Sequence, residues 1–219
     1  MSSRVLSGLS VAVFLLGSRG LANPLYSIPV SNFSFESPSC GSVGPAVCSP
    51  AGWALTGISG ALLPASTAWD SIPDGTQVAF ANAGALTQNL AVTIVPDATY
   101  TLSVWVSRRS TAGQSFLPEI ELLGGSTALF TMNISNPGGA APTLNTDGTY
   151  NWQDWTMTYT APSSGAIIGQ ALSISLGSDG AQTNFDNVSA QTSASPEPGM
   201  FLLIGGGLMG LGLWRRFAK

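Results

Sequence analysis

Two glutamates, Glu119 and Glu121, are the residues best placed for acid–base chemistry. In a strand, positions i and i+2 lie on one face, which sets both carboxylates opposite Ile120 and Leu122. Paired carboxylates suit a glycoside hydrolase, which needs two of them about 5 to 9 Å apart across the scissile bond. Two neighbours on one strand approach from the same side, and the sequence indicates no catalytic cleft. We therefore expect polar contacts, within the sheet or to a glycan, rather than hydrolysis.

Histidine is absent, and charged residues make up 8% of the 219-residue chain. Without imidazole, neither a Ser-His-Asp nor a Cys-His nucleophile can be assembled. The formal net charge of −4 excludes a nucleic-acid partner, because such binding depends on Lys and Arg against phosphate. Between residues 23 and 195, ten Asp and Glu residues stand against only Arg108 and Arg109. A domain this acidic favours divalent cations or neutral glycans as partners.

The elements that must position these residues are predicted to be strands. Residues 100–107 alternate between apolar and polar, and so do 86–94, 154–159 and 172–177, which is typical of half-buried strands. Turn sequences rich in Gly, Pro, Asn and Asp separate these segments, as at 73–75, 136–139 and 178–180. The pattern predicts an all-β fold, a single antiparallel β-sandwich of the jelly-roll type with about eight strands.

Aromatic side chains on a sheet surface can stack on the apolar faces of sugar rings. The strand alternation places Trp155 and Trp53 in the core. It places Trp105 and Trp152 on the opposite face, and Trp69 lies in a loop. We therefore consider these last three, together with the two glutamates, as a candidate glycan-binding surface. The alternative is that they pack under loops or at a sheet edge.

Cys40 and Cys48 are the only cysteines of the chain. In an exported protein, two cysteines this close predict a local disulfide that closes the loop between the first two strands. Two cysteines without histidine would make a poor zinc site.

Several short motifs follow one another along most of the chain, and their order resembles that of galactose-binding-like jelly rolls, including carbohydrate-binding modules. They are Asn32–Pro38, Gly52–Trp53, Pro73–Gly75, Leu86–Leu90, Tyr100–Ser103 and Asn184–Val188. The resemblance implies a two-layer antiparallel sandwich whose first and last strands are adjacent. It also implies a structural calcium held by Glu36 and Asp186, with carbonyls and water completing the oxygen ligands. The alternative is that both are ordinary turn carboxylates. No other cofactor is expected.

The N-terminal residues 1–22 have the features of a secretory signal peptide. Arg4 precedes an apolar run from Val5 to Leu16, and small residues stand at Gly20 and Ala22. We expect cleavage after Ala22, followed by a β-domain at 23–191 and a short polar linker at 192–195.

The C-terminal residues 196–219 combine Pro196-Glu197-Pro198, an uncharged stretch ending at Trp214, and the basic residues Arg215, Arg216 and Lys219. This order of parts resembles the PEP-CTERM sorting signal of bacterial envelope proteins. The resemblance implies a transmembrane helix at about 199–214, a cytoplasmic basic anchor and processing by an exosortase, a membrane-embedded transpeptidase. The basic end agrees with the positive-inside rule, so the domain is expected outside the membrane.

These features predict an exported protein of the cell envelope or surface, anchored by its C-terminal helix before processing and in some cases released to the extracellular matrix. Its expected role is structural or adhesive, without catalysis. A second hypothesis is a module that binds extracellular polysaccharide. The third and least favoured is a glycoside hydrolase.

Overall fold

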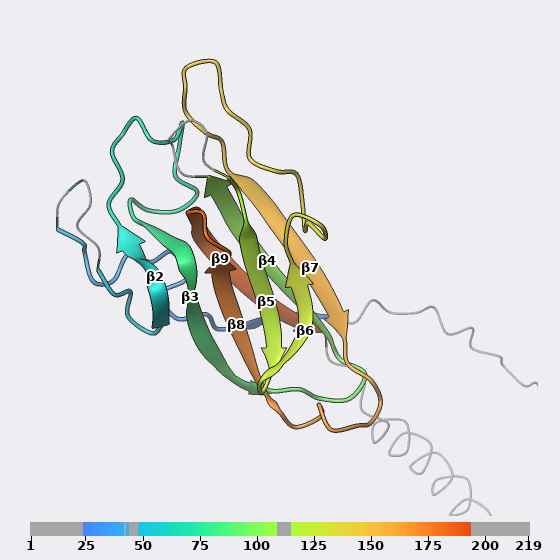
Figure 1. Ribbon diagram of the computed structural model, residues 1–219. Helices are drawn as coiled ribbons and strands as arrows, with labels where there is room; N and C mark the ends of the chain where they lie inside the picture. Colours follow the sequence, from blue (N-terminus) through green and yellow to red (C-terminus); the bar gives the residue numbers. More distant parts are fainter. Residues whose placement is uncertain (1–23, 42, 44–47, 109–114, 194–219) are drawn as a thin grey trace, which may run out of the picture.

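The computed structural model describes residues 24–41, 43, 48–108 and 115–193 (Figure 1). These ranges contain strands, turns and loops but no helix, which confirms the all-β, antiparallel expectation. The strands are β1 (Leu25–Ile28), β2 (Ala54–Leu62), β3 (Val78–Thr93), β4 (Thr99–Arg108), β5 (Pro118–Gly124), β6 (Thr127–Met132), β7 (Gln153–Thr160), β8 (Ala171–Ser178) and β9 (Thr183–Ser193).

Residue alternation explains why these segments form strands. In β4 the side chains of Tyr100, Leu102, Val104 and Val106 are buried, whereas those of Thr101 and Ser103 are half-buried. A segment with this period suits a half-buried strand, because the apolar side chains all point into the core and the polar side chains all point to the opposite face. The four segments predicted from alternation are found in β3, β4, β7 and β8.

The nine strands form one continuous antiparallel sheet rather than two separate sheets. Its order is β6-β5-β8-β3-β9-β4-β7, with β1 paired to β9 and β2 paired to β3. The link is β3, which is 16 residues long. Its first part, Ala79–Ala81, pairs with β9, and its second part, from Gly84, pairs with β8. In Figure 1 the β8–β5–β6 portion overlies β9 and β4.

The main core lies between these two portions of the sheet. Ile120 and Leu122 of β5 join Leu102 and Val104 of β4 in the same buried cluster, to which Trp155 also belongs. Trp53 is buried in this cluster as well, so the prediction that both tryptophans are core residues is confirmed. β1 pairs with β9, with Ile28 opposite Ala190, as the expected adjacency of first and last strands requires.

A second, smaller core lies on the other side of the sheet, and it contains the tryptophans of the candidate glycan-binding surface. Trp69 and Trp152 are only 7% and 6% exposed, and their rings lie 5.2 Å apart. Trp105 is half-buried against the same cluster. The reason is the loop 63–77 between β2 and β3, which covers the face that strand alternation assigned to solvent. Of the two alternatives that the sequence leaves open for Trp69 and Trp152, the structure shows packing under a loop rather than exposure on the sheet surface.

Cys40 and Cys48 form a disulfide, with Cα atoms 5.4 Å apart. At the other end of the domain, β9 extends to Ser193 and so includes the first two residues of the expected linker. The expected signal peptide 1–22, the Pro196-Glu197-Pro198 motif, the helix 199–214 and the basic residues Arg215, Arg216 and Lys219 lie outside the described residues. Within the described part of the chain, no helix has the length and apolar character needed to cross a membrane.

Candidate active site

A groove on the outer face of β3, β8 and β5 contains the two glutamates predicted from the sequence. Glu119 lies opposite Gly177 of β8, which in turn lies opposite Ala85 of β3. Because glycine and alanine add little bulk beside Glu119, the sheet surface is hollowed there. The hollow has a volume of about 330 Å³, and its lining comprises Ala83, Gly84, Ala85, Glu119, Glu121, Ser175, Gly177, Ser178 and Asp179.

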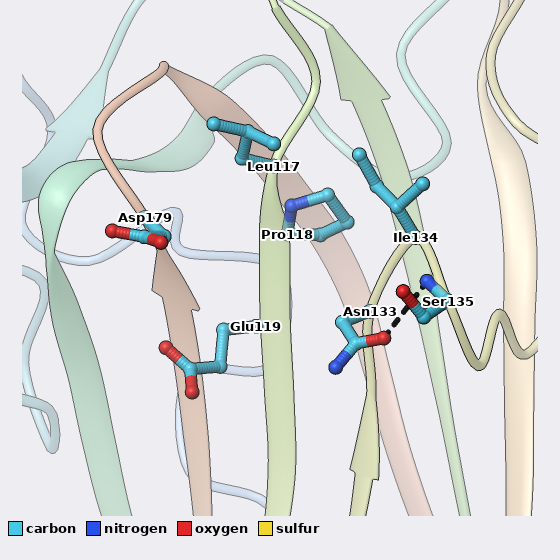
Figure 2. Close-up of a pocket in the computed structure, with 7 residues that line it drawn as sticks. All are labelled: Leu117, Pro118, Glu119, Asn133, Ile134, Ser135 and Asp179. Atoms are coloured by element: carbon cyan, nitrogen blue, oxygen red, sulfur yellow. Dashed lines mark hydrogen bonds between the residues drawn. The ribbon is translucent and has the colours of Figure 1, made fainter.

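A third carboxylate, Asp179, joins the pair from the turn after β8. The Asp179 amide donates to the Leu117 carbonyl at 3.0 Å, which continues the β5–β8 register beyond the strand. Asp179 is thus the diagonal neighbour of Glu119 on the same face, a relation that places residues about 7 to 8 Å apart. Figure 2 shows both carboxylates on the same side of β5. The sequence indicated Asp179 only as a turn residue, because its partner strand cannot be inferred from local pattern.

A second hollow, of about 220 Å³, adjoins the first and shares Glu119 and Asp179 with it (Figure 2). Its far wall is the turn after β6. There the Asn133 Oδ1 atom accepts hydrogen bonds from the Ser135 and Asn136 amides, at 2.9 and 3.0 Å. This turn presents Ile134, which is 53% exposed, at the edge of the hollow. The carboxylates therefore have an apolar side chain across from them.

The chemistry of the groove is acidic and apolar. None of the described residues that line the two hollows is cationic. Glu121 is held by the Thr131 hydroxyl, which donates to its Oε1 atom at 3.3 Å. Carboxyl groups in this setting can transfer protons to and from a bound molecule and can stabilise positive charge that develops on it.

The two residues predicted to hold calcium come together elsewhere, against residues 74–77. Asp186 is fully buried; its Oδ2 atom accepts from the Asp74 amide at 2.9 Å, and its Oδ1 atom accepts from the Asn187 amide at 2.8 Å. Glu36 Oε1 accepts from the amides of Thr76 and Gln77, at 2.7 and 2.6 Å.

Burial raises the pKa of Asp186 to about 7, and the negative charges of Asp74 and Glu36 add to this effect, while the two amide donors oppose it. Within the described residues, no group of three or more His, Cys, Asp or Glu side chains is arranged to hold a metal ion. A cation at Glu36 and Asp186 would therefore need backbone oxygens or water as further ligands.

The structure separates the residues of the predicted glycan-binding surface. Glu119 and Glu121 lie in the groove over β5 and β8, whereas Trp69 of the loop 63–77 packs with Trp105 and Trp152 in the second core. Among the described residues, no single surface presents both groups, so the structure does not assemble the candidate glycan-binding residues into one site.

The comparison with known families decides the class of protein. The sequence model of the family described as HpiC1-like, HpiC1 cyclase, matches residues 26–191, which is nearly the whole described domain. The chain belongs to the HpiC1-like cyclase family. No curated protein matches it. The expected non-catalytic structural or adhesive role is therefore wrong, as is the expectation that the protein is not an enzyme, because the family is one of cyclases. The same finding weakens the polysaccharide-binding alternative.

Solved structures of cyclases share the fold. The cyclase Fisc from Fischerella sp. TAU, in complex with (3Z)-3-(1-methyl-2-pyrrolidinylidene)-3H-indole, is 21% identical with a TM-score of 0.65; the match covers 79% of this chain and all of that one. An apo cyclase from Fischerella sp. is 24% identical with a TM-score of 0.62, over 78% of this chain and 98% of that one. The CBM22-1 xylan-binding domain of Paenibacillus barcinonensis Xyn10C has a TM-score of 0.43 and 14% identity, over 80% and 98%.

Proposed function

We propose that this protein is a cyclase that closes a ring on a compact unsaturated substrate by proton transfer in the groove over β3, β8 and β5. The observation that carries the proposal is the convergence of Glu119, from β5, and Asp179, from the turn after β8, onto one hollow with a floor of small residues. Membership of a cyclase family supplies the reaction class.

The chemistry divides between two carboxyl groups. One, in its protonated form, donates a proton to an unsaturated carbon of the substrate, and the resulting cation is attacked by an electron-rich carbon of the same molecule. One carbon–carbon bond forms at the expense of a π bond. A carboxylate then removes a proton from the attacking carbon, so that the product is an isomer of the substrate. Glu119 and Asp179 are assigned to these two steps, and Glu121 adds negative charge that stabilises the cation.

The shape of the groove favours a flat aromatic substrate. Its floor at Gly84, Ala85 and Gly177 projects no long side chain, and Ile134 offers an apolar contact at one edge. The Fischerella cyclases have been solved with indole compounds, one of them 4-(1H-indol-3-yl)butan-2-one. An indole-bearing molecule is therefore the first substrate class to test.

The test measures isomerisation of a panel of 3-alkenylindoles, separated by chromatography and identified by unchanged mass, with wild-type protein and the variants Glu119→Gln and Asp179→Asn. Each variant should lower kcat by about 10²- to 10⁴-fold, the usual contribution of a general acid or base. Asp154→Asn is the matched control, because Asp154 is an exposed carboxylate of β7 outside the groove. Turnover that is unaffected by both groove variants would refute the assignment.

We also propose a structural calcium held by Glu36 and Asp186. The support is a fully buried carboxylate with a second carboxylate bound to the same short segment, an arrangement that a divalent cation would neutralise. Calcium here would stabilise the loop 63–77 and would take no part in proton transfer. A calcium-dependent rise in the melting temperature, absent in Glu36→Gln, is the expected result; equal melting curves in calcium and EGTA would contradict it.

For localisation, we propose export of the cyclase domain, with processing by an exosortase at Pro196-Glu197-Pro198. The sequence features of both ends and the disulfide support this, since disulfides persist in oxidising compartments. Fractionation of cells that express wild-type protein or Glu197→Ala, with mass determination of the mature chain, tests it. Normal processing of Glu197→Ala would contradict the sorting role.

A further inference from the structure

A separate hollow of about 550 Å³ lies on the loop 63–77, with Val43 on its rim. Its apolar lining is formed by Val43, Leu63, Pro64, Ala65, Trp69 and Ile72. None of these residues takes part in the acidic groove, whose lining comes from β3, β5, β8 and the turns beside them.

The walls of this hollow are fixed by contacts on two sides. Val43 forms a backbone bridge with Leu63, and Cys48 exchanges two backbone hydrogen bonds with Ala61, at 3.0 and 2.8 Å. The disulfide joins Cys40 to Cys48, which these hydrogen bonds hold at the end of β2.

On the opposite side, the wall is held by the second core. The Trp69 Nε1 atom donates to the Arg108 carbonyl at 3.2 Å, and the Trp69 ring packs on Trp152. Contacts within the chain therefore hold both walls of the hollow, and a largely preformed cavity is typical of small-molecule sites.

The polar groups of the hollow select a cation. Asp70 is its one charged residue among the described lining, and the hydroxyl groups of Ser66, Ser71 and Thr76 can accept hydrogen bonds. The surrounding domain is strongly acidic, with ten Asp and Glu residues against Arg108 and Arg109, which attracts cations and repels anions. We propose that this hollow is a second binding site, which takes a compact apolar molecule carrying an ammonium group.

Three probes of nearly equal shape test the proposal: 1-aminoadamantane, 1-adamantanol and adamantane-1-carboxylate. Binding to the purified protein is followed by titration of the methyl carbon–proton NMR signals of Val43, Leu63 and Ile72. The amine should bind about fivefold more tightly than the alcohol, which corresponds to the upper end for an exposed ion pair, and the carboxylate should bind most weakly.

Two variants separate charge from shape. Asp70→Asn should abolish the preference for the amine and leave binding of the alcohol unchanged, whereas Asp97→Asn, in the turn before β4, should change neither. Replacement of both cysteines by alanine should weaken binding of the amine and of the alcohol by the same factor, because the loss of the disulfide affects the shape of the hollow beside Val43 and leaves its charge unchanged. An amine preference that survives Asp70→Asn, or signal shifts confined to residues of the acidic groove, would overturn the proposal.

Discussion

The buried carboxyl group of Asp186 makes the stability of the metal-free domain depend on pH in an unusual direction. In the folded protein its pKa is raised from 3.8 to about 7, chiefly by burial. The folded state therefore holds this proton more tightly than the unfolded state. The stability contributed by Asp186 is complete below about pH 4 and is lost as the pH rises towards 7.

The size of the effect follows from the shift. One pKa unit corresponds to about 1.4 kcal/mol, so a shift from 3.8 to about 7 corresponds to about 4 kcal/mol. For a domain of this size, that is a change of about 8 to 16 °C in melting temperature. Asp186→Asn cannot ionise, so its free energy of unfolding relative to wild type should increase by about 4 kcal/mol between pH 4 and pH 8.

The assay is urea denaturation of both proteins in EDTA at several pH values, repeated in calcium. Calcium at the proposed site would bind the ionised carboxylate, so in calcium the wild-type protein should gain stability as the pH rises, opposite to its behaviour in EDTA. Asp147→Asn is a control of opposite sign, because hydrogen bonds from Thr149 lower the pKa of that exposed carboxylate and its contribution is lost only in acid. A difference between wild type and Asp186→Asn that stays constant from pH 4 to pH 8 would refute the reasoning.

Three further substitutions test the positions of individual residues. Gln88→Leu should lower the free energy of unfolding by about 2 to 4 kcal/mol in urea denaturation. The buried side-chain amide of Gln88 accepts a hydrogen bond from the Ser31 amide and donates to the carbonyls of Ser31 and Gly52. A loss below about 1 kcal/mol would show that water replaces these hydrogen bonds. Gly57→Ala should lower the free energy of unfolding by about 3 kcal/mol or more. Gly57 has a φ of 58° at the β2 bulge, and a Cβ atom there would lie 2.3 Å from a carbonyl oxygen of β3. An unchanged melting temperature would contradict this. Gly177→Val should weaken binding of 4-(1H-indol-3-yl)butan-2-one at least tenfold by filling the groove floor, and unchanged binding in calorimetry would place that ligand elsewhere.

The sequence alone predicts the strands that bury one face. The alternation at 100–106 and 172–176 has a single physical explanation, a side chain period of two with one side in the core. For Trp152 the alternation leaves exposure and burial under a loop both open, and the structure shows it buried with Trp69 of the loop 63–77. Periodicity reports which face of a strand a residue occupies, and it carries no information about a distant segment that covers that face.

The candidate site shows the same limit in a different form. The alternation places Glu119 and Glu121 on one face, as the structure shows, but two carboxylates on one strand approach from one side and do not by themselves indicate catalysis. The structure adds Asp179 from the end of β8, about 60 residues further along the chain. Only the pairing of β5 with β8 reveals that neighbour, and strand pairing over such a separation leaves no local signal.

The pairing of β9 has a consequence for when the protein can fold. This last strand forms hydrogen bonds with β1, β3 and β4, so it joins segments that begin at residues 25, 78 and 99. The sheet cannot close until residue 193 has left the ribosome, and contacts of such long range form slowly. Under the export proposed above, a chain that stays open until β9 is complete would suit passage through a translocation channel, which accepts extended polypeptide.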